Sequence, residues 1–465
     1  MERTHTSLTR DLVEHLLELD RDDLTQDVLD STRALLFDFI GVAANGASTA
    51  SAQAMQAFVT ALDDGHAPII GTSLTTSPLR AAMANGVAAH AIEYDDTHNA
   101  SSSHPGSVII PAAMAAASMS ETDAGSFLLG VVVGYEAMGR IGRAAGPASH
   151  YARHFHPTGT TGHFGAAAAA ASILGLDPEQ TASAFGIAGS MAAGSMQFIL
   201  EGAWTKRLHP AHAARDGVEA ALLAQSGYLG PHDAVAGERG FLAGYCESPN
   251  PKELLAEWGD RDLEIQNTSM KAHTCCRYMQ GPIDALLDIR AEHNIGPDEI
   301  ESIIVGLPSV AEDIVAEPVE KKRRPQNVVD AQFSMPFGAA VAMRFGRVSL
   351  PEFDEAVFKD PEIRRLMDIT QCVVDPDLDL AYPIQWRAWS EVTTVDGRSY
   401  RASVDDPKGD PANPFSSDEL RAKFDMLTAG CYSEVRRERL AGAALGLGAK
   451  SELEDLFALL GTDLT

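Results

Sequence analysis

Histidines gather within residues 90–212 of this 465-residue chain, beside short breaks between helical segments. Imidazole titrates near pH 6.5, so histidine is a frequent proton carrier in catalysis. A single histidine is more often structural, but several at helix breaks indicate acid–base chemistry. The histidines in this region are His90, His98, His104, His150, His154, His156, His163, His209 and His212.

The segment EYDDTHNASSSHPGS, residues 93–107, interrupts two Ala-rich flanks that are typical of buried helices. His104 stands directly before a Pro-Gly turn. Because loops often carry functional side chains, we assign His104 a functional role. For Asp95 we favour a helix cap instead. The hydroxyl groups of Ser101 to Ser103 are candidate caps for the next helix, whose backbone N–H groups would then face an anion.

The segment HFHPTGTTGHFGAAAAAA, residues 154–171, repeats this arrangement of histidines, a turn, hydroxyl side chains and a helix of small residues. His156, directly before the proline, would lie at the base of the turn. Thr158, Thr160 and Thr161 are candidate helix caps. A helix this rich in alanine can be buried on all sides.

Cationic side chains cluster in two later segments, although the net charge of the chain is −29. Such a cluster either neutralises buried acids or receives an anionic substrate. Lysine is a point-charge partner for a carboxylate, and arginine binds one through two parallel hydrogen bonds. The clustered side chains are Lys206, Arg207, His209, His212 and Arg215 in the first segment, and Lys271, His273 and Arg277 in the second, where Tyr278 follows directly.

Sequence motifs for metal, nucleotide and acyl chemistry are missing from the chain. Cys275 and Cys276 are adjacent, and neither C-x-x-C nor H-E-x-x-H spacing occurs, so we predict no metal site and packing roles for both cysteines. No GxGxxG follows a strand, and GxxxxGK[ST] and GxSxG are absent. What remains is acid–base chemistry on a small polyanion.

The composition excludes further classes of protein. A pI near 4.8 opposes binding to nucleic acid or to an anionic membrane, because the electrostatic interaction would be repulsive. The longest apolar runs fall well short of the roughly 18 residues of a membrane span. An odd number of cysteines, five, predicts reduced thiols. The reduced thiols, together with an N-terminus that lacks an apolar signal core, predict a cytoplasmic protein. The acidity fits an ordinary acidic surface, which we favour, or a salty cytoplasm.

Helical periodicity dominates the first 260 residues, and strand-like alternation appears only after them. Strands are predicted at residues 297–308, 372–379 and 389–407, the last with a hairpin turn at Asp396-Gly397. The basic run from Lys321 to Arg324 is predicted to be a solvated loop.

We therefore predict a mainly α protein, in which a smaller α+β domain is inserted into a large all-helical domain. The helical domain begins with residues 1–265, and the α+β domain covers residues 266–405. Residues 406–465 are predicted to be C-terminal helices that return to the helical domain.

Five of these segments, in order along the chain, resemble motifs of the MmgE/PrpD family. The resemblance covers nearly the whole chain. It implies a homodimer whose subunits have a large helical domain and a smaller, lid-like α+β domain. It also implies a site between the domains, and no metal or organic cofactor. The matching stretches are HAIEYDDTH with SSHPGSVIIPAA, FHPTGTTGHFGAAAAAA, WTKRLHPAHAARDG, MKAHTCCRY and DAQFSMPFGAAVAM.

The resemblance also implies roles for single residues. One departure from the family pattern is Met279-Gln280, where relatives often have Thr-His, and His273 on the same loop is a candidate substitute. At the first acid of the first motif this chain has Glu, where a relative such as the decarboxylase has Asp. Matched residue by residue, the family's site falls on Glu93, Thr97, His104, His156, Lys206 and Lys271.

Known members include 2-methylcitrate dehydratase, cis-aconitate decarboxylase and iminodisuccinate epimerase, whose reactions build enolate or carbanion charge beside a carboxylate. We predict a cofactor-independent acid–base enzyme for a small di- or tricarboxylate, and favour a 2-methylcitrate dehydratase-like lyase over an epimerase or a decarboxylase. A non-catalytic carboxylate-binding or scaffold protein is the remote alternative. The predicted catalytic residues are His104, His156, Lys206 and Lys271. The predicted substrate-binding residues are Glu93, Asp96, Thr97, Arg207, His273, Arg277 and Tyr278.

Overall fold

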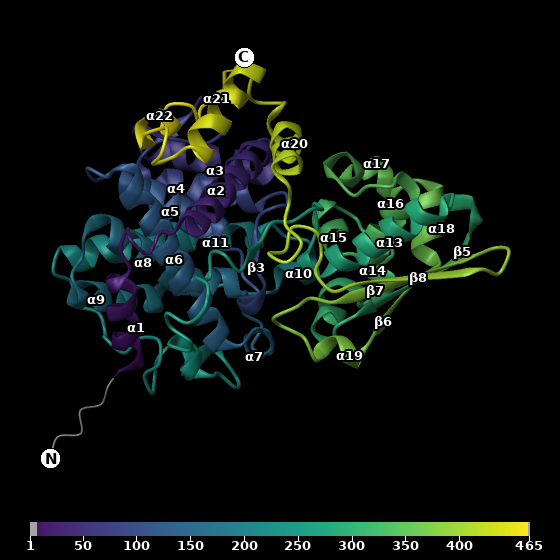
Figure 1. The fold of residues 1–465 in the computed structure, drawn as a ribbon, viewed down its shortest axis with the longest axis horizontal. Coiled ribbons are helices and arrows are strands. Elements are labelled where there is room, and N and C mark those ends of the chain that lie inside the picture. Colours follow the sequence, from purple (N-terminus) through teal and green to yellow (C-terminus); the bar gives the residue numbers. More distant parts are fainter. Residues whose placement is uncertain (1–6, 464–465) are drawn as a thin grey trace.

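The computed structural model of the chain describes residues 7–463. Its large domain, on the left of Figure 1, is built of helices that pack around α8 (Pro157–Leu174). All residues from Pro157 to Ala171 are buried. Alanine favours the helix and is small enough for α6 (Ala124–Ala145) and α11 (Thr205–Gln225) to lie against it. The predicted burial of this Ala-rich helix on all sides is confirmed.

Several other helices of this domain begin at capping residues. Ser7 accepts a hydrogen bond from the N–H of Arg10 at the start of α1, and Asp177 forms a capping box with Gln180 at the start of α9. Besides α6, α8 and α11, the helices of this domain are α1 (Leu8–Glu18), α2 (Gln26–Gly46), α3 (Ala50–Leu62), α4 (Pro78–His90), α5 (Gly106–Ala117), α7 (Pro147–Tyr151), α9 (Pro178–Met191), α10 (Phe198–Glu201) and α12 (Phe241–Tyr245). The short strands β1 (Ala67–Pro68) and β2 (Thr75–Thr76) pair with each other.

The smaller domain, on the right of Figure 1, contains a four-stranded sheet with helices packed against it. The strand order is β6-β5-β7-β8, with β5 and β6 parallel and the other neighbours antiparallel. Alternate residues of β7 are buried, as expected where one face of a sheet is covered. The elements are β5 (Ile300–Leu307), β6 (Thr370–Val374), β7 (Ala388–Thr394), β8 (Ser399–Val404), α13 (Gln280–His293), α14 (Val319–Lys322), α15 (Val328–Gln332), α16 (Met335–Phe345), α17 (Glu355–Phe358), α18 (Pro361–Asp368) and α19 (Pro376–Asp379).

The last helices, α20 (Ser417–Thr428), α21 (Glu434–Leu445) and α22 (Leu453–Phe457), return to the helical domain. Phe424 of α20 stacks on Phe37 of α2 with ring centroids 4.1 Å apart, and Lys423 forms an ion pair with Asp38 at 2.8 Å. The predicted mainly α fold with a second α+β domain is confirmed. The domain boundaries stay a prediction, and residues 1–6 and 464–465 lie outside the described residues.

Two local predictions were wrong. The predicted strand at residues 372–379 is shorter, because the side chain of Asp375 caps α19 and ends the extended chain. The basic run is not a solvated loop. Lys322 is buried and donates hydrogen bonds to the carbonyl oxygens of Ile314 and Phe333, at 2.6 and 2.9 Å. None of the described helices combines the length and the apolar character needed to cross a bilayer.

A short pair of strands joins the two domains beside the predicted site. β3 (Thr97–His98) pairs with β4 (Thr268–Ser269), so that Thr97 lies opposite Ser269. The hydroxyl of Tyr94 donates to the carbonyl oxygen of Ala272 at 2.8 Å. The segment that leads into the smaller domain therefore runs along the acidic loop of the larger one.

Candidate active site

A cavity lies between the two domains, where these segments meet. It brings together three of the four predicted catalytic residues, His104, His156 and Lys206. The wall formed by the helical domain consists of Glu93, Thr97, Ser102, His104, Tyr151, His156, Met196, Phe198, Ile199 and Lys206, and the wall formed by the smaller domain of Cys276, Arg277, Tyr278, Ile314, Phe333 and Trp386.

The loop after α4 holds Glu93 in an unusual backbone conformation. Its φ is +53°, in the left-handed region that side chains other than glycine rarely adopt. Such a conformation costs about 1–3 kcal/mol and persists only where the surroundings hold it. The turn aims the Glu93 carboxylate at the ammonium group of Lys206 on α11.

The sequence predicted that backbone N–H groups at the N-terminus of α5 face an anion. In the structure the side chain of Asp96 takes this position. Both carboxylate oxygens of Asp96 accept a hydrogen bond from the N–H of Gly106, at 2.9 and 3.0 Å, and the hydroxyl of Tyr135 donates to the same group at 2.7 Å. Burial raises the pKa of Asp96 to about 7. The carboxyl group of Asp96 thus occupies the helix terminus, and Asp96 does not line the cavity.

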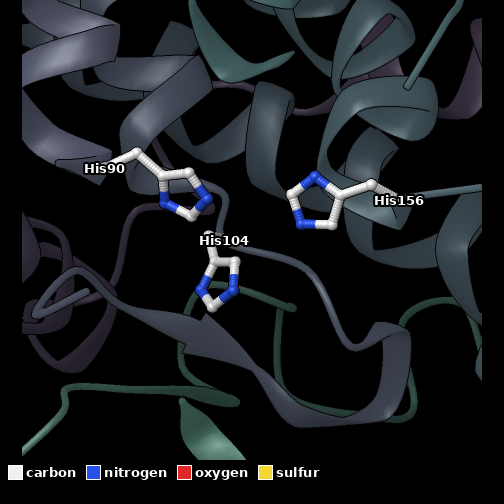
Figure 2. Close-up of side chains that lie close together, drawn as sticks. All are labelled: His90, His104 and His156. Atoms are coloured by element: carbon white, nitrogen blue, oxygen red, sulfur yellow. The ribbon is translucent and has the colours of Figure 1, made fainter. Parts of the chain in front are cut away.

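Three buried histidines lie close together beside the cavity (Figure 2). The ring centroids of His90 and His104 are 4.9 Å apart, those of His90 and His156 5.8 Å, and those of His104 and His156 6.3 Å. The three rings come from the end of α4, the loop before α5 and the residue before α8. Helix ends and loops, rather than a strand or a helix face, therefore position the cluster.

The three rings hydrogen-bond through Nδ1, and within residues 7–463 their Nε2 atoms have no hydrogen-bond partner. Nδ1 of His90 lies 2.6 Å from a carboxylate oxygen of Asp95, and Nδ1 of His104 lies 2.7 Å from the carbonyl oxygen of Asp96. Nδ1 of His156 lies 3.1 Å from Nδ1 of His209. An oxygen acceptor at Nδ1 fixes the proton there, so Nε2 of His90 and of His104 carries a lone pair in the neutral ring. In the pair of His156 and His209, either Nδ1 atom can carry the proton. The Nε2 atom of His90 is buried with no partner among the described residues.

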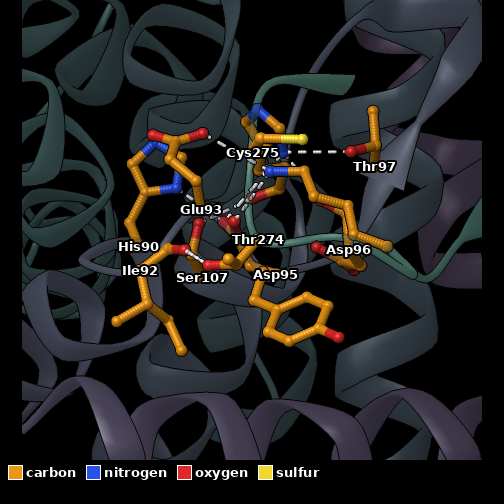
Figure 3. A network of polar contacts seen from close by, with 12 residues as sticks. His90, Ile92, Glu93, Asp95, Asp96, Thr97, Ser107, Thr274 and Cys275 are labelled. Carbon is orange, nitrogen blue, oxygen red and sulfur yellow. Dashed lines mark hydrogen bonds and ion pairs between the residues drawn. The ribbon is translucent and has the colours of Figure 1, made fainter. Parts of the chain in front are cut away.

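Lysine and carboxylate groups form a buried ionic array next to the histidines, part of which Figure 3 shows. Lys206 pairs with one oxygen of Glu93, and Nζ of Lys271 lies 3.4 Å from the other. Lys271 also lies 3.3 Å from Asp95. Lys271 is fully buried and does not line the cavity, but it contacts Glu93, which does.

Within this ionic array, each acid and each lysine shifts the pKa of its neighbours. Burial would raise the pKa of Glu93, but Lys206 and Lys271 outweigh it and hold the pKa well below the usual range. Burial likewise opposes ionisation of Asp95, while His90 and Lys271 keep its pKa low. For Lys206, burial lowers the pKa and Glu93 opposes the shift. The pKa of Lys271 is raised, because Asp95 and Glu93 together outweigh its burial.

The histidines are neutral in the free protein. Burial lowers the pKa of His104 well below 6.5, although Asp95 opposes the shift. Burial also lowers the pKa of His156 far below that value, and His209 adds to the shift. A neutral imidazole with a free Nε2 can accept a proton, and it becomes an acid once an anion enters and raises its pKa.

The smaller domain contributes a cation with an unused donor. Arg277 pairs with Asp410, and its Nε donates to Asn99 at 3.2 Å, whereas its Nη1 is buried without a partner among the described residues. The ring of Tyr278 stacks on Trp386 with centroids 4.2 Å apart. Both predicted binding residues, Arg277 and Tyr278, therefore line the cavity.

Two further predicted residues lie elsewhere. Arg207 donates to the hydroxyl of Ser51 at 2.9 Å, and Nε2 of His273 lies 2.8 Å from Asp284; neither lines the cavity. Gln280, at the departure from the family pattern, holds the backbone of the loop: its side-chain oxygen accepts from the N–H of His273 at 2.9 Å. His273 thus does not take the place of the missing histidine in the cavity wall.

The sequence interpretation missed His90, Asp95 and His209. His90 opens the same motif as Glu93, and Asp95 lies between residues that were assigned to the site. His209 lies three residues after Lys206 on α11, a spacing that brings two side chains to one face of a helix. The apolar wall was also missed, because an apolar side chain gives no sign of chemistry in a sequence. Phe198 lies eight residues before Lys206, and Phe333 lies within the stretch DAQFSMPFGAAVAM. Cys275 and Cys276 pack in the core of the smaller domain, as predicted.

Among the described residues, the three histidines also form a group that could hold a metal ion. One ligand atom from each lies within 4.8 Å of the others. The ammonium groups of Lys206 and Lys271 oppose a further cation, because like charges repel strongly in a poorly solvated site. The prediction of no metal stays a prediction.

Comparison with known proteins decides the family. Residues 10–254 match the MmgE/PrpD N-terminal domain, and residues 273–447 match the MmgE/PrpD C-terminal domain. The chain belongs to the MmgE/PrpD family. The two matched regions correspond to the helical domain and to the smaller domain with its following helices.

Members of the MmgE/PrpD family similar to this chain carry the name of one reaction. The chain is 30% identical to the cis-aconitate decarboxylase-like protein oryM of Aspergillus oryzae, over 98% of each chain. It is 30% identical to human cis-aconitate decarboxylase, over 75% of this chain and 72% of the human protein. It is 26% identical to cis-aconitate decarboxylase of Aspergillus terreus, over 98% of this chain and 96% of the fungal protein. These relatives support a lyase of the dehydratase or decarboxylase type.

Proposed function

We propose that the protein is a cofactor-independent carboxy-lyase that decarboxylates a small unsaturated tricarboxylate such as cis-aconitate. The observation that carries the proposal is the division of the cavity wall. One part offers Lys206, Arg277 and two histidines, and the other part is apolar. The names of the similar proteins point to the same reaction.

The polar part suits the carboxylates that stay on the substrate. Arg277 has a buried donor without a partner, which a carboxylate oxygen would satisfy. Lys206 lies within the wall and faces the ring of Phe333, with Nζ 4.9 Å from the ring centroid. In such a poorly solvated place an ammonium group stabilises negative charge far more than it does in water.

The apolar part suits the carboxylate that leaves. Phe198, Phe333 and Ile314 solvate a carboxylate poorly and neutral carbon dioxide well, so they favour C–C cleavage. The electron pair of that bond moves through the double bond to the carbon beside a remaining carboxylate. There a proton from His104 or His156 forms the new C–H bond. Proton transfer from a positioned group typically contributes about 10²–10⁴-fold to the rate.

A 2-methylcitrate dehydratase-like reaction is the second candidate, because it needs a base at carbon and an acid at the leaving hydroxyl. His104 and His156, with ring centroids 6.3 Å apart, offer such a pair. An epimerase would place the two histidines on opposite faces of one carbon. The three reactions therefore differ in where a proton is removed from the substrate and where one is added.

The test is incubation with cis-aconitate, 2-methylcitrate, citrate and iminodisuccinate in deuterated water, followed by NMR. We expect cis-aconitate to lose one carbon as carbon dioxide and to gain one deuterium. Water loss from 2-methylcitrate, without decarboxylation of cis-aconitate, would overturn the proposal in favour of the dehydratase. His104→Gln should abolish turnover with a preserved fold, and His232→Gln, at a partly exposed histidine outside the cavity wall, is the matched control.

A further inference from the structure

A second pocket borders the histidine cluster and opens to solvent. Its wall includes His209, His212 and Asp216, and it shares Phe198 with the cavity between the domains. Other residues of its wall, such as Ser195 and Glu201, are exposed. Titratable groups thus lead from the molecular surface toward the buried site.

His209 connects this pocket to His156. The two Nδ1 atoms are 3.1 Å apart, and the ring centroids are 5.3 Å apart. His156 is buried, whereas His209 is half-buried and lines the second pocket. Two facing Nδ1 atoms form a hydrogen bond only when one carries the proton and the other offers a lone pair.

Glycine makes this approach of α8 and α11 possible. A Cβ atom on Gly159, in the first turn of α8, would lie 2.6 Å from the carbonyl oxygen of Ala193 and 3.0 Å from Cβ of His209. A larger residue would therefore displace His209 from His156. The pairing of the two rings depends on a contact that only glycine allows without a shift.

We propose that His209 relays protons between His156 and the second pocket, so that the buried site exchanges protons with solvent without opening the cavity. The inference rests on the proposed function in one respect: decarboxylation consumes one proton in each turnover. The polar side chains that line the cavity, such as His104, His156 and Lys206, are buried. The proton consumed in each turnover therefore needs a route from solvent to these side chains.

The transfer balances in protons. Nε2–H of His156 gives its proton to the substrate carbon, while Nδ1–H of His209 gives its proton to Nδ1 of His156. Nε2 of His209 takes a proton from water in the second pocket. Both rings remain neutral and end in the other tautomer. Burial, aided by His90, lowers the pKa of His209 to about 3, so no net charge has to rest on either ring.

The test compares His209→Gln with the wild-type protein. The glutamine amide can still hydrogen-bond to His156 but cannot pass a proton on. With ¹⁵N-labelled histidine and no substrate, we expect solvent exchange of the His156 ring proton to slow by about tenfold or more. His212→Gln is the matched control, because His212 lies in the same pocket on the same helix but has no side-chain hydrogen bond to another described residue.

A second measurement excludes a merely structural role. His209→Ala should lower kcat with cis-aconitate by about tenfold or more with little change in KM, and added imidazole should restore it. Unchanged exchange in His209→Gln would overturn the relay, whatever the turnover. Slowed exchange in His209→Gln, together with a wild-type protein that turns over none of the substrates, would support the relay and refute the proposed function instead.

Discussion

At the scale of single residues, the buried charges of the site already cancel. Glu93 and Asp95 carry two negative charges, and Lys206 and Lys271 carry two positive ones. A bound tricarboxylate therefore needs further positive charge. The donor of Arg277 and the neutral histidines can supply it, because an anion beside a buried imidazole raises its pKa. Binding and protonation of the histidines are thus coupled.

Lys206→Met should remove turnover and lower the free energy of unfolding by about 3 kcal/mol, because it leaves Glu93 buried beside Lys271 alone. Adding Glu93→Gln should restore much of the stability but not the turnover. Chemical denaturation and a turnover assay measure the two effects separately. A double variant as active as the wild type would show that Lys206 has no role beyond neutralising Glu93.

Removal of metal should leave turnover unchanged. Lys206 and Lys271 next to the histidine cluster disfavour a further cation, and the proposed chemistry needs none. The measurement is turnover after exhaustive chelation, with elemental analysis of the same sample. Loss of turnover that a single divalent ion restores would identify His90, His104 and His156 as metal ligands.

At the scale of elements, the site depends on the close packing of α8 and α11, which carry His156 and Lys206 at their starts. A Cβ atom on Gly217 of α11 would lie 2.6 Å from the backbone nitrogen of Ala167 and closer still to Cβ of Ala166. Side chains of alanine and glycine therefore set the distance between the two helices, and with it the position of Lys206 relative to the histidines.

Gly217→Ala should lower the free energy of unfolding by about 1–3 kcal/mol, because the added methyl group forces the two helices apart. Gly442→Ala is the matched control, because a Cβ atom there would meet nothing within 4 Å. In the helix interior of α21 this control should stabilise the protein by up to about 1 kcal/mol. Thermal or chemical denaturation compares the two variants. Equal effects would refute the close-packing account.

Much of the fold could be predicted from the sequence, because its elements have strong local signals. Ala-rich runs predicted α8, and the Asp396-Gly397 turn predicted the hairpin of β7 and β8. The segment 372–379 was mistaken for a strand because the cap at Asp375 competes with extension. The pairing of His156 with His209 needed tertiary structure, since residues 53 apart in sequence give no sign of contact.

At the scale of the whole molecule, burial of titratable groups makes stability depend on pH. Burial lowers the pKa of His156 in the folded protein, whereas in the unfolded chain it gains a proton near pH 6.5. Its contribution to the free energy of unfolding is therefore full above that pH and is lost as pH falls below it. Asp96 acts in the opposite direction. Burial raises its pKa from 3.8 to about 7, so its contribution is lost as pH rises toward 7.

His156→Gln and Asp96→Asn should therefore change the pH dependence of unfolding in opposite directions. Between about pH 5 and pH 6.5, each group changes the slope by up to about 1.4 kcal/mol per pH unit. The histidine variant should make stability rise less with pH, and the asparagine variant should make it rise more. Chemical denaturation across this range gives the slopes, and two slopes equal to that of the wild type would contradict the assigned protonation states.

The convergence of cations and neutral histidines on a carboxylate is tested most directly by calorimetric titration with propane-1,2,3-tricarboxylate, a saturated analogue that cannot follow the proposed reaction. In two buffers of different ionisation enthalpy near pH 7, we predict binding with net uptake of protons. Lys206→Met should abolish that binding, whereas Lys359→Met, at an exposed lysine, should leave it intact. Absence of binding, or equal binding by Lys206→Met and the wild type, would contradict the account.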